Sequence, residues 1–199
     1  MYSWVRIPPL ALMKMKSTEK VLSKIEEQAK QVFLPLVGRK KGKLLEAIVR
    51  KKQPKLILEI GTLIGFSAIL MARHLKGKGA KIVSIEIAPH AAAAAERNLK
   101  DAGFSEKVKV LVGDALSIIP KLKGKFGLVF VDAAKEEYLS YLQMLEKRNL
   151  QKGTVVVADN AKIFADAMQD YLHYVRNSGR YKSKFYDFGE DGMEVSVRL

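Results

Sequence analysis

Two apolar stretches that end on carboxylates are the first feature of this sequence that could do chemistry. The run Leu128–Val131 ends at Asp132. A second run, residues 155–157, leads to Asp159 and Asn160. Carboxylate and amide oxygens are the hard ligands that Mg²⁺ prefers, and two carboxylates balance its charge. Each aspartate could instead cap a following helix, but the two ends together favour one divalent-metal site.

A lysine follows the first of these ends. Lys135 lies three residues after Asp132, within FVDAAKEEY. If a nearby cation and partial burial lowered its pKa, its amine could accept a proton from a hydroxyl substrate. Most lysines in so basic a chain are only surface charges. The residues alone leave both interpretations open.

A glycine turn follows an earlier apolar run, in LEIGTLIGFS at residues 58–67. Gly61 and Gly65 allow a tight turn and a close approach to a ligand, with Thr62 and Leu63 between them. The helix expected from Phe66 directs its free N–H groups to the same place. The spacing E-x-G-x-x-x-G differs from the dinucleotide pattern G-x-G-x-x-G.

Three more acidic residues stand at the ends of apolar runs. Glu59 ends the first run, and Glu86 ends VSIEI at about the place where a carboxylate binds ribose hydroxyls. A surface or capping carboxylate is the alternative for Glu86. Asp114 and Ala115 follow the third run in VGDA, where the carboxylate could accept from an adenine amino group or cap the next helix. This set indicates a nucleotide-like ligand.

The elements that must position these residues alternate between strands and helices. Helices are expected at residues 17–34 and 41–52, and the last two segments, YKSKFYDF and MEVSVRL, alternate as an antiparallel hairpin does. The alternation predicts an α/β protein with a doubly wound, mostly parallel seven-stranded sheet, whose ligands bind at the carboxyl ends of its strands. The expected parallel strands are residues 55–60, 81–86, 108–113, 126–132 and 154–159.

Composition allows a single globular domain of residues 1–199. The chain is 48% hydrophobic, without an apolar run of the roughly 18 residues that a membrane span needs. Cys is 0, which excludes disulfides and thiolate metal sites, and the three histidines have no zinc spacing. The cytoplasm is the expected location, without a membrane partner.

The charge of the chain favours anionic partners. Its formal net charge is +14 and its pI is about 9.8, which fits RNA as a partner. A solvated, lysine-rich surface is an equal alternative.

An N-terminal arm and helix are expected at residues 1–40, before a cofactor-binding and catalytic core at residues 41–199. The arm, MYSWVRIPPLALMKMK, is mildly apolar and basic. Pro8 and Pro9 interrupt it, and it has no clear small-residue cleavage site. These features favour an arm over a signal peptide.

As a set, the motifs LEIGTLIGFSAI, SIEI, VGDA, FVDAAKEEY and ADN resemble those of class I S-adenosylmethionine-dependent O-methyltransferases. The resemblance is to the cation-dependent branch that includes catechol and caffeoyl-CoA O-methyltransferases, and it covers residues 37–199. It implies a Rossmann-like fold, S-adenosylmethionine and Mg²⁺ or another divalent cation as cofactors, and a small catechol-like hydroxyl substrate. It also implies a homodimer.

The resemblance further implies a role for each motif residue. Asp132, Asp159 and Asn160 would bind the metal, and Lys135 would be the general base beside Asp132. The segment LVGRKKGKLL is similar to the family's loop that enters the site, so Lys41, Lys135 and Asn160 would contact the substrate. The implied cofactor residues are Val37, Glu59, Gly61, Thr62, Leu63, Gly65, Ser67, Glu86, Ile87, Gly113, Asp114, Ala115 and Asp132.

Three departures from the family pattern leave the substrate open. Ala133 and Ala134 stand where some relatives have larger residues. The chain passes from Asn160 directly into AKIFADAMQDYL without a long substrate loop, which indicates a more open site. An acidic substrate contact known in part of the family has no clear counterpart near residues 186–190.

Two other functions compete with a small-molecule methyltransferase. One is an RNA O-methyltransferase of the tRNA hydroxyuridine type on the same scaffold, in which GRKKGK, RKKQPK, KLKGK and RYKSK would clamp phosphates. The other is a non-enzymatic binding module that retains the fold.

Overall fold

The structure, a computed structural model, describes residues 9–199, with side chains from Ser17 onward. Residues 1–8 and the side chains of residues 9–16 of the expected N-terminal arm therefore lie outside the described part. None of the helices described is long and apolar enough to cross a membrane.

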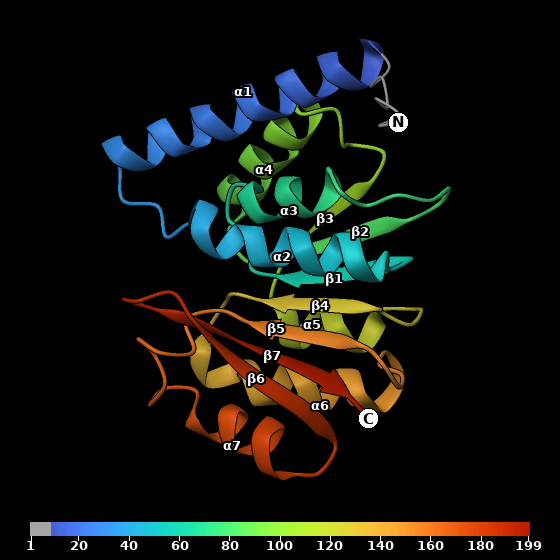
Figure 1. Cartoon of the computed structure of the whole chain (residues 1–199), viewed down its shortest axis with the longest axis vertical. Helices are drawn as coiled ribbons and strands as arrows, with labels where there is room; N and C mark the ends of the chain where they lie inside the picture. The colour runs from blue at the N-terminus through green and yellow to red at the C-terminus, as the bar shows by residue number, and fades with distance from the viewer. Residues whose placement is uncertain (1–8) are drawn as a thin grey trace, which may run out of the picture.

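A seven-stranded sheet forms the centre of the molecule, with strand order β3-β2-β1-β4-β5-β7-β6 (Figure 1). The first five strands in this order are parallel, and β7 pairs antiparallel with both β5 and β6. This arrangement confirms the predicted doubly wound sheet with its C-terminal hairpin. The strands are β1 (Leu56–Ile60), β2 (Lys81–Glu86), β3 (Val108–Val112), β4 (Leu128–Val131), β5 (Val155–Ala158), β6 (Tyr181–Asp187) and β7 (Gly192–Arg198).

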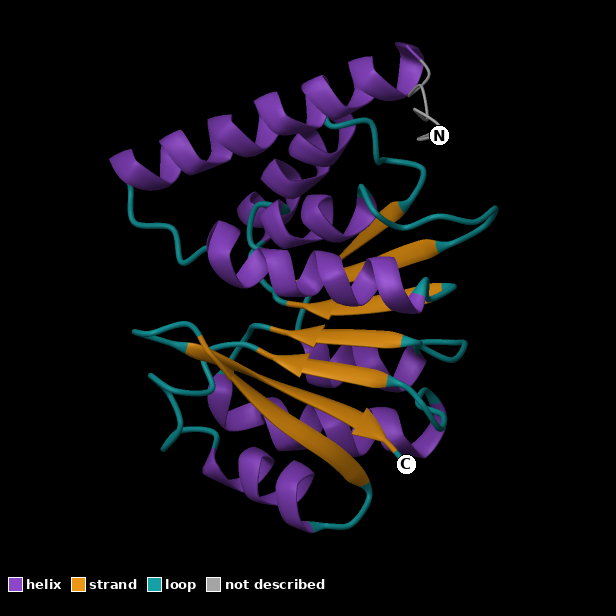
Figure 2. Cartoon of the chain, viewed as in Figure 1, coloured by secondary structure: helices purple, strands orange, loops and turns teal. Residues whose placement is uncertain are grey.

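Helices cover both faces of the sheet (Figure 2). The buried side chains of α1 to α4 pack on one face, and those of α5 to α7 pack on the other. The α-helices are α1 (Pro9–Gln31), α2 (Gly38–Lys52), α3 (Phe66–Ala72), α4 (Pro89–Asp101), α5 (Ala115–Ile118), α6 (Tyr138–Arg148) and α7 (Gln169–Asn177), and the 3₁₀ turns are η1 (Ile119–Lys121) and η2 (Lys135–Glu137).

The central strands are apolar throughout because both of their faces are buried. Every residue of β4 and β5 is buried. Side chains alternate between faces along a strand, so Phe130 packs in the core beneath α1 to α4 while Val129 and Val131 pack in the core beneath α6 and α7. A carboxylate at the end of such a strand is therefore held by a rigid element.

Four helix boundaries differ from the sequence prediction. The first helix begins at Pro9 rather than at residue 17, because proline fits the first turn of a helix. The second begins at Gly38 rather than at residue 41. The first helix also ends at Gln31 rather than at residue 34. After β5 the chain makes successive turns before α7 begins at Gln169.

The glycine turn after β1 lies against the end of β4. These strands are neighbours, although β2 and β3 extend from the opposite side of β1, so the crevice lies at the point where strand order reverses. Gly61 has a φ of 86°, and a Cβ there would lie 2.0 Å from the carbonyl oxygen of Asp132. Only glycine permits this contact.

We expect Gly61→Ala to destabilise the fold by about 2 kcal/mol or more beyond the cost of a positive φ alone, because the new methyl group displaces the Asp132 backbone. Gly77→Ala is the matched control, since Gly77 has a φ of 98° and a Cβ there would have nothing within 4 Å. Urea unfolding measures both variants. Equal losses of unfolding free energy would contradict the proposed close contact.

Candidate active site

A cavity of about 970 Å³ lies at the carboxyl ends of the parallel strands. It brings together most of the residues predicted from the sequence, although they come from separate loops. The predicted residues that line it are Val37, Lys41, Gly61, Thr62, Leu63, Ser67, Glu86, Ile87, Gly113, Asp114, Ala115, Asp132, Lys135, Asp159 and Asn160.

Glu59 and Gly65 do not line this cavity. Glu59 is fully buried behind its wall and accepts hydrogen bonds of 2.5 Å from the hydroxyls of Ser67 and Ser84. Burial raises the pKa of Glu59 despite these bonds. Gly65 precedes α3, where a Cβ would lie 3.3 Å from the Cα of Ala95, so its small size allows α4 to approach. Both residues therefore support the turn from behind.

Glu86 fixes the glycine turn to the end of β2. Its Oε2 accepts from the backbone N–H of Leu63 at 2.7 Å, and its Oε1 accepts from the N–H of Ala88 at 3.0 Å. Leu63 has a φ of 50°, a conformation that this hydrogen bond helps to hold. The carboxylate lies on the cavity wall, where its ribose-binding role stays a prediction.

Asp114 caps α5, which was one of its two predicted roles. Its side chain accepts from the backbone N–H groups of Leu116 and Ser117 and from the Ser117 hydroxyl. The Ser117 hydroxyl and these N–H groups lower the pKa of Asp114. The adenine contact stays a prediction.

The register of three adjacent parallel strands aligns the chemically important strand ends. Ile60 of β1 is opposite Val131 of β4, and Val131 is opposite Ala158 of β5. The next residues, Gly61, Asp132 and Asp159, therefore follow one another across the sheet at intervals of about 4.8 Å. Sequence-distant carboxylates meet because their strands end at the same level.

Neither aspartate caps a helix, so that alternative is wrong. The caps of η2, α6 and α7 are Ala134, Glu137 and Met168, without a side-chain hydrogen bond. Asp159 is only 1% exposed, and burial, together with the nearby charge of Asp132, raises the pKa of Asp159 to about 6. The two carboxylates are thus close enough to repel each other.

Lys41 partly balances this negative charge. Its ammonium lies 2.7 Å from Oδ1 of Asp159 and 2.6 Å from Oδ2 of Asp191. Burial alone would lower the pKa of Lys41, but the two carboxylates outweigh burial and raise it. Lys41 therefore stands in the first turn of α2 as a charged part of the carboxylate cluster, and its contact with the substrate stays a prediction.

Asp191 is a site residue that the sequence analysis missed. It follows β6, lines the cavity and accepts a hydrogen bond of 2.8 Å from the side-chain amide of Asn160. It lies one residue beyond residues 186–190, for which the sequence indicated no clear acidic counterpart, and Glu190 within that range also lines the cavity. Its acidic type and place in the GEDG turn were visible, but the sequence alone did not show that the turn reaches the cavity.

Lys135 lies beside Asp132 as predicted. Its ammonium donates to Oδ1 of Asp132 and to the hydroxyl of Tyr138, both at 2.9 Å. Tyr138, whose role was also missed, is buried, and burial together with the charge of Asp132 raises its pKa well above the ordinary value. Tyr138 therefore remains a neutral phenol that orients Lys135.

The oxygen atoms at the strand ends fit a divalent cation. Asn160 has a φ of 62° and uses its amide nitrogen for Asp191, so its amide oxygen is the atom left to coordinate. Oδ1 of Asp159 is buried and accepts no hydrogen bond, although it lies near Lys41. No cluster of three or more His, Cys, Asp or Glu side chains within the described chain has metal-site geometry. A cation here would therefore depend on two carboxylates and one amide.

Comparison with known proteins identifies the family. A family model described as O-methyltransferase matches residues 14–174. The chain belongs to the O-methyltransferase family. Among its relatives, catechol O-methyltransferase of Sus scrofa is 37% identical over 173 residues, which cover 81% of this chain and 91% of that protein. Catechol O-methyltransferase B of Danio rerio is 38% identical over 175 residues, or 82% of this chain and 65% of the relative.

Solved structures of O-methyltransferases have the same fold. An enzyme from Bacillus cereus in complex with SAH has a TM-score of 0.81 at 25% identity, covering 92% of this chain and 91% of that one. One from Streptomyces achromogenes, involved in tomaymycin synthesis and in complex with SAM, has a TM-score of 0.80 at 29% identity, with 90% of each chain covered. This chain spans 65% of the length of the Danio rerio relative and 62% of the length of catechol O-methyltransferase of Bos taurus.

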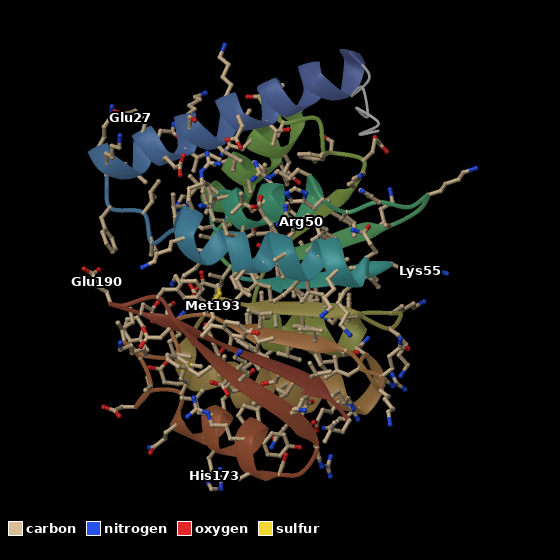
Figure 3. The ribbon with its side chains drawn as sticks, viewed as in Figure 1. Glu27, Arg50, Lys55, His173, Glu190 and Met193 are labelled. Carbon is tan, nitrogen blue, oxygen red and sulfur yellow. The ribbon has the colours of Figure 1, made fainter. Side chains whose placement is uncertain are left out.

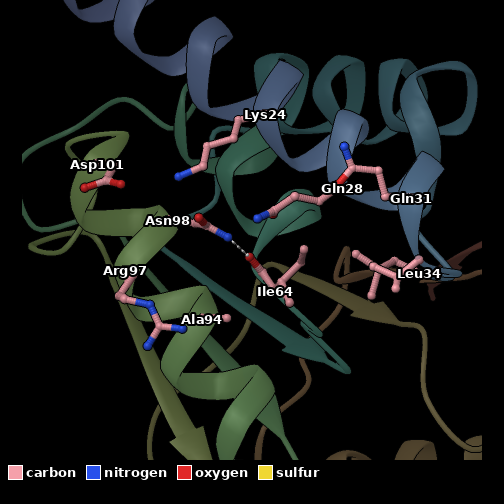
Figure 4. Close-up of a pocket in the computed structure, with 10 residues that line it drawn as sticks. Lys24, Gln28, Gln31, Leu34, Ile64, Ala94, Arg97, Asn98 and Asp101 are labelled. Carbon is pink, nitrogen blue, oxygen red and sulfur yellow. Dashed lines mark hydrogen bonds between the residues drawn. The ribbon is translucent and has the colours of Figure 1, made fainter.

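A second hollow of about 440 Å³ lies between α1 and α4 (Figure 4). Lys24, Gln28 and Gln31 of α1 face Arg97 and Asn98 of α4 across it. The side-chain amide nitrogen of Asn98 already donates a hydrogen bond of 2.9 Å to the backbone carbonyl of Ile64. Asp101 also lines the hollow, but it forms no ion pair with Lys24 or Arg97 there.

Burial of Glu59 gives the stability of the chain a testable dependence on pH. Its pKa is higher in the folded chain than in the unfolded chain, because burial disfavours the charged carboxylate. Its contribution to stability is therefore fully present below the unfolded pKa and is lost as pH rises through the folded pKa. Glu59→Gln removes this titration, so the variant should gain stability relative to the wild type over the pH range that begins at the unfolded pKa and ends where the folded carboxylate ionises.

Urea unfolding at several pH values within that range measures the difference. Glu96→Gln, at an exposed position of α4, is the control. A stability difference between Glu59→Gln and wild type that stays constant with pH would contradict the prediction.

Proposed function

We propose that the chain is an S-adenosylmethionine-dependent O-methyltransferase that methylates a hydroxyl of a small catechol-like molecule with a divalent cation. The observation that supports this most is the convergence of Asp132, Lys135, Asp159 and Asn160 in one cavity. Catechol O-methyltransferase relatives and structural neighbours with SAM or SAH support the reaction type.

The residues of the cavity divide into a cofactor part and a metal part. The glycine turn, Glu86 and Asp114 would hold S-adenosylmethionine, while Asp132, Asp159 and Asn160 would hold the cation. When bound, the cofactor supplies an electrophilic methyl group, and the cation favours the deprotonated form of a substrate hydroxyl. A cavity of about 970 Å³ has room for a cofactor and a small substrate together.

Lys135 is the residue that would receive the hydroxyl proton. In its neutral form, Nζ offers one lone pair to the substrate hydroxyl, and its contacts with Asp132 and Tyr138 hold it in position. Tyr138 keeps its own proton because its pKa is raised by burial and by nearby carboxylates. The lysine and the phenol therefore have separate roles, as base and orienting group.

An apolar wall beside Lys135 suits a flat aromatic substrate. Ile163 and Phe164 line the cavity and are 55% and 47% exposed, so a ligand could cover them. The ammonium of Lys135 lies 5.9 Å from the centre of the Phe164 ring. Ala133 and Ala134 also line the cavity, and their small side chains leave room for a ligand. A catechol-like ring on this wall would place its hydroxyl near the base.

RNA as the methylated substrate has less support. Arg39 in GRKKGK is bound by Glu19 and Glu26, and Lys41 is bound by carboxylates of the cluster. The segments RKKQPK and KLKGK precede β1 and β4, at the end of the sheet away from the cavity. The single domain, the homodimer and the cytoplasmic location stay predictions.

Transfer of a labelled methyl group from S-adenosylmethionine to a catechol panel, with Mg²⁺ or with EDTA, tests the proposed function. We expect turnover only with the cation, and losses of about 10²-fold or more for Asp132→Asn, Asp159→Asn and Lys135→Met. Asp166→Asn, on an exposed turn after β5, is the control. Undiminished turnover in EDTA, or in the Asp159 variant, would contradict the metal site.

Lys41→Met should strengthen metal binding. The ammonium lies 2.7 Å from Asp159 Oδ1, so its charge repels a cation bound by the same carboxylate. We expect the Kd for Mn²⁺, measured by calorimetry without substrate, to fall about tenfold, which corresponds to about 1.4 kcal/mol.

Lys40→Met is the matched control, because the Lys40 ammonium binds the carbonyl of Phe188 rather than the carboxylates. Weaker Mn²⁺ binding in the Lys41 variant alone would show instead that Lys41 holds Asp159 in position for the metal.

A further inference from the structure

Positive charge gathers at the end of the sheet opposite the cavity. Four neighbouring strands, β2, β1, β4 and β5, each have three or more basic side chains where they begin, when the end of the preceding helix or turn, the connection and the first strand residue are counted together. Adjacent strands are about 4.8 Å apart, so these connections form a row about 15 Å long across the sheet. We call it the basic row: Arg50, Lys51, Lys52, Lys55, Lys76, Lys78, Lys81, Lys121, Lys123, Lys125, Lys147, Arg148 and Lys152.

At the opposite end of the molecule, basic side chains are paired with carboxylates. Figure 3 shows Lys55 at the amino ends of the strands and Glu190 at their carboxyl ends, far apart across the view. At the cavity end, Lys41, Lys135 and Lys162 are each paired with a carboxylate. No member of the basic row forms an ion pair in the part of the chain described, so its charge stays available to a partner.

Helix ends account for only part of the row. Basic residues in the last turn of a helix interact favourably with its dipole, which explains those at the ends of α2 and α6. Lys55, Lys78 and Lys123, however, are exposed on connections outside the α-helices. Two acidic residues of the described chain lie close to the row: Glu146, which is already paired with Arg180, and the exposed Glu106, whose backbone carbonyl accepts from the ammonium of Lys81.

We propose that the basic row is a docking site for the phosphate backbone of duplex RNA, separate from the methylation site. A row of charges on rigid strand starts matches a linear polyanion. Most of its members are lysines, which act as point charges for phosphates rather than as readers of base edges. Binding at this site is therefore independent of sequence.

The surroundings of the row favour duplex RNA over a membrane or DNA. Of the large apolar side chains exposed on the described chain, only Leu199 lies at this end, so little can insert into lipid or stack on bases. The connecting helices end here, and none projects as a helix that enters a DNA major groove would. Backbone-directed contact is the usual mode of duplex-RNA recognition.

Fluorescence anisotropy of the full chain with a labelled RNA duplex of about 20 base pairs tests the site. With about six phosphate contacts, affinity should fall about 10³-fold between 50 and 200 mM salt. The triple variant Lys52→Glu, Lys78→Glu, Lys123→Glu should bind at least about tenfold more weakly and lower the salt slope by about three.

Lys20→Glu, Lys24→Glu, Lys43→Glu is the matched control, with the same change in net charge on exposed positions of α1 and α2. It should keep most of the affinity, and circular dichroism should show both variants folded. Equal losses in the two variants would overturn the site. Tighter binding to DNA of the same sequence, or to vesicles with about 30% phosphatidylserine, would overturn the assignment to RNA.

Discussion

The balance of charge at the strand ends is the constraint on which the site depends. Asp132, Asp159 and Asp191 bring three carboxylates into one cavity, and Lys41 and Lys135 supply two ammonium groups. Taking a charge out of water without a partner costs several kcal/mol, so the fold requires these lysines. The raised pKa of Asp159, caused by burial and by Asp132, shows that the balance is incomplete. Among these five groups one negative charge remains, and this favours a further cation.

The backbone holds these charges together more firmly than the ion pairs could. Gly61 packs against the carbonyl of Asp132, and the parallel register places Asp159 next across the sheet. A slip of a buried strand by one residue would move each side chain into the core on the other face of the sheet, where its size and shape do not match the packing. Repulsion between the carboxylates is therefore opposed by the whole core rather than by local contacts.

The sequence predicted the site carboxylates whose positions depend on the ends of strands. It missed site residues whose positions depend on turns and on packing. Asp132 and Asp159 follow continuous apolar runs, and parallel strands bring their carboxyl ends to one edge. Asp191 reaches the site only because β7 pairs antiparallel with β5 and returns the hairpin turn to the cavity. Tyr138 was missed because its aromatic ring is typical of any core position. The pairing of Lys41 with Asp159 spans most of the chain and has no sequence pattern.

The position of the positive charge explains how a chain with so high a net positive charge could still bind a cation in its cavity. A net charge of +14 spread around the cavity would repel a divalent ion and weaken its binding. The basic row instead begins at the amino ends of the strands, and a five-residue strand such as β1 separates it from the cavity by about 17 Å. That distance is about twice the Debye length of about 8 Å at physiological salt, so the row is largely screened from the site. The proposed metal site would therefore respond to its own carboxylates and to Lys41, while the row is free to attract a polyanion.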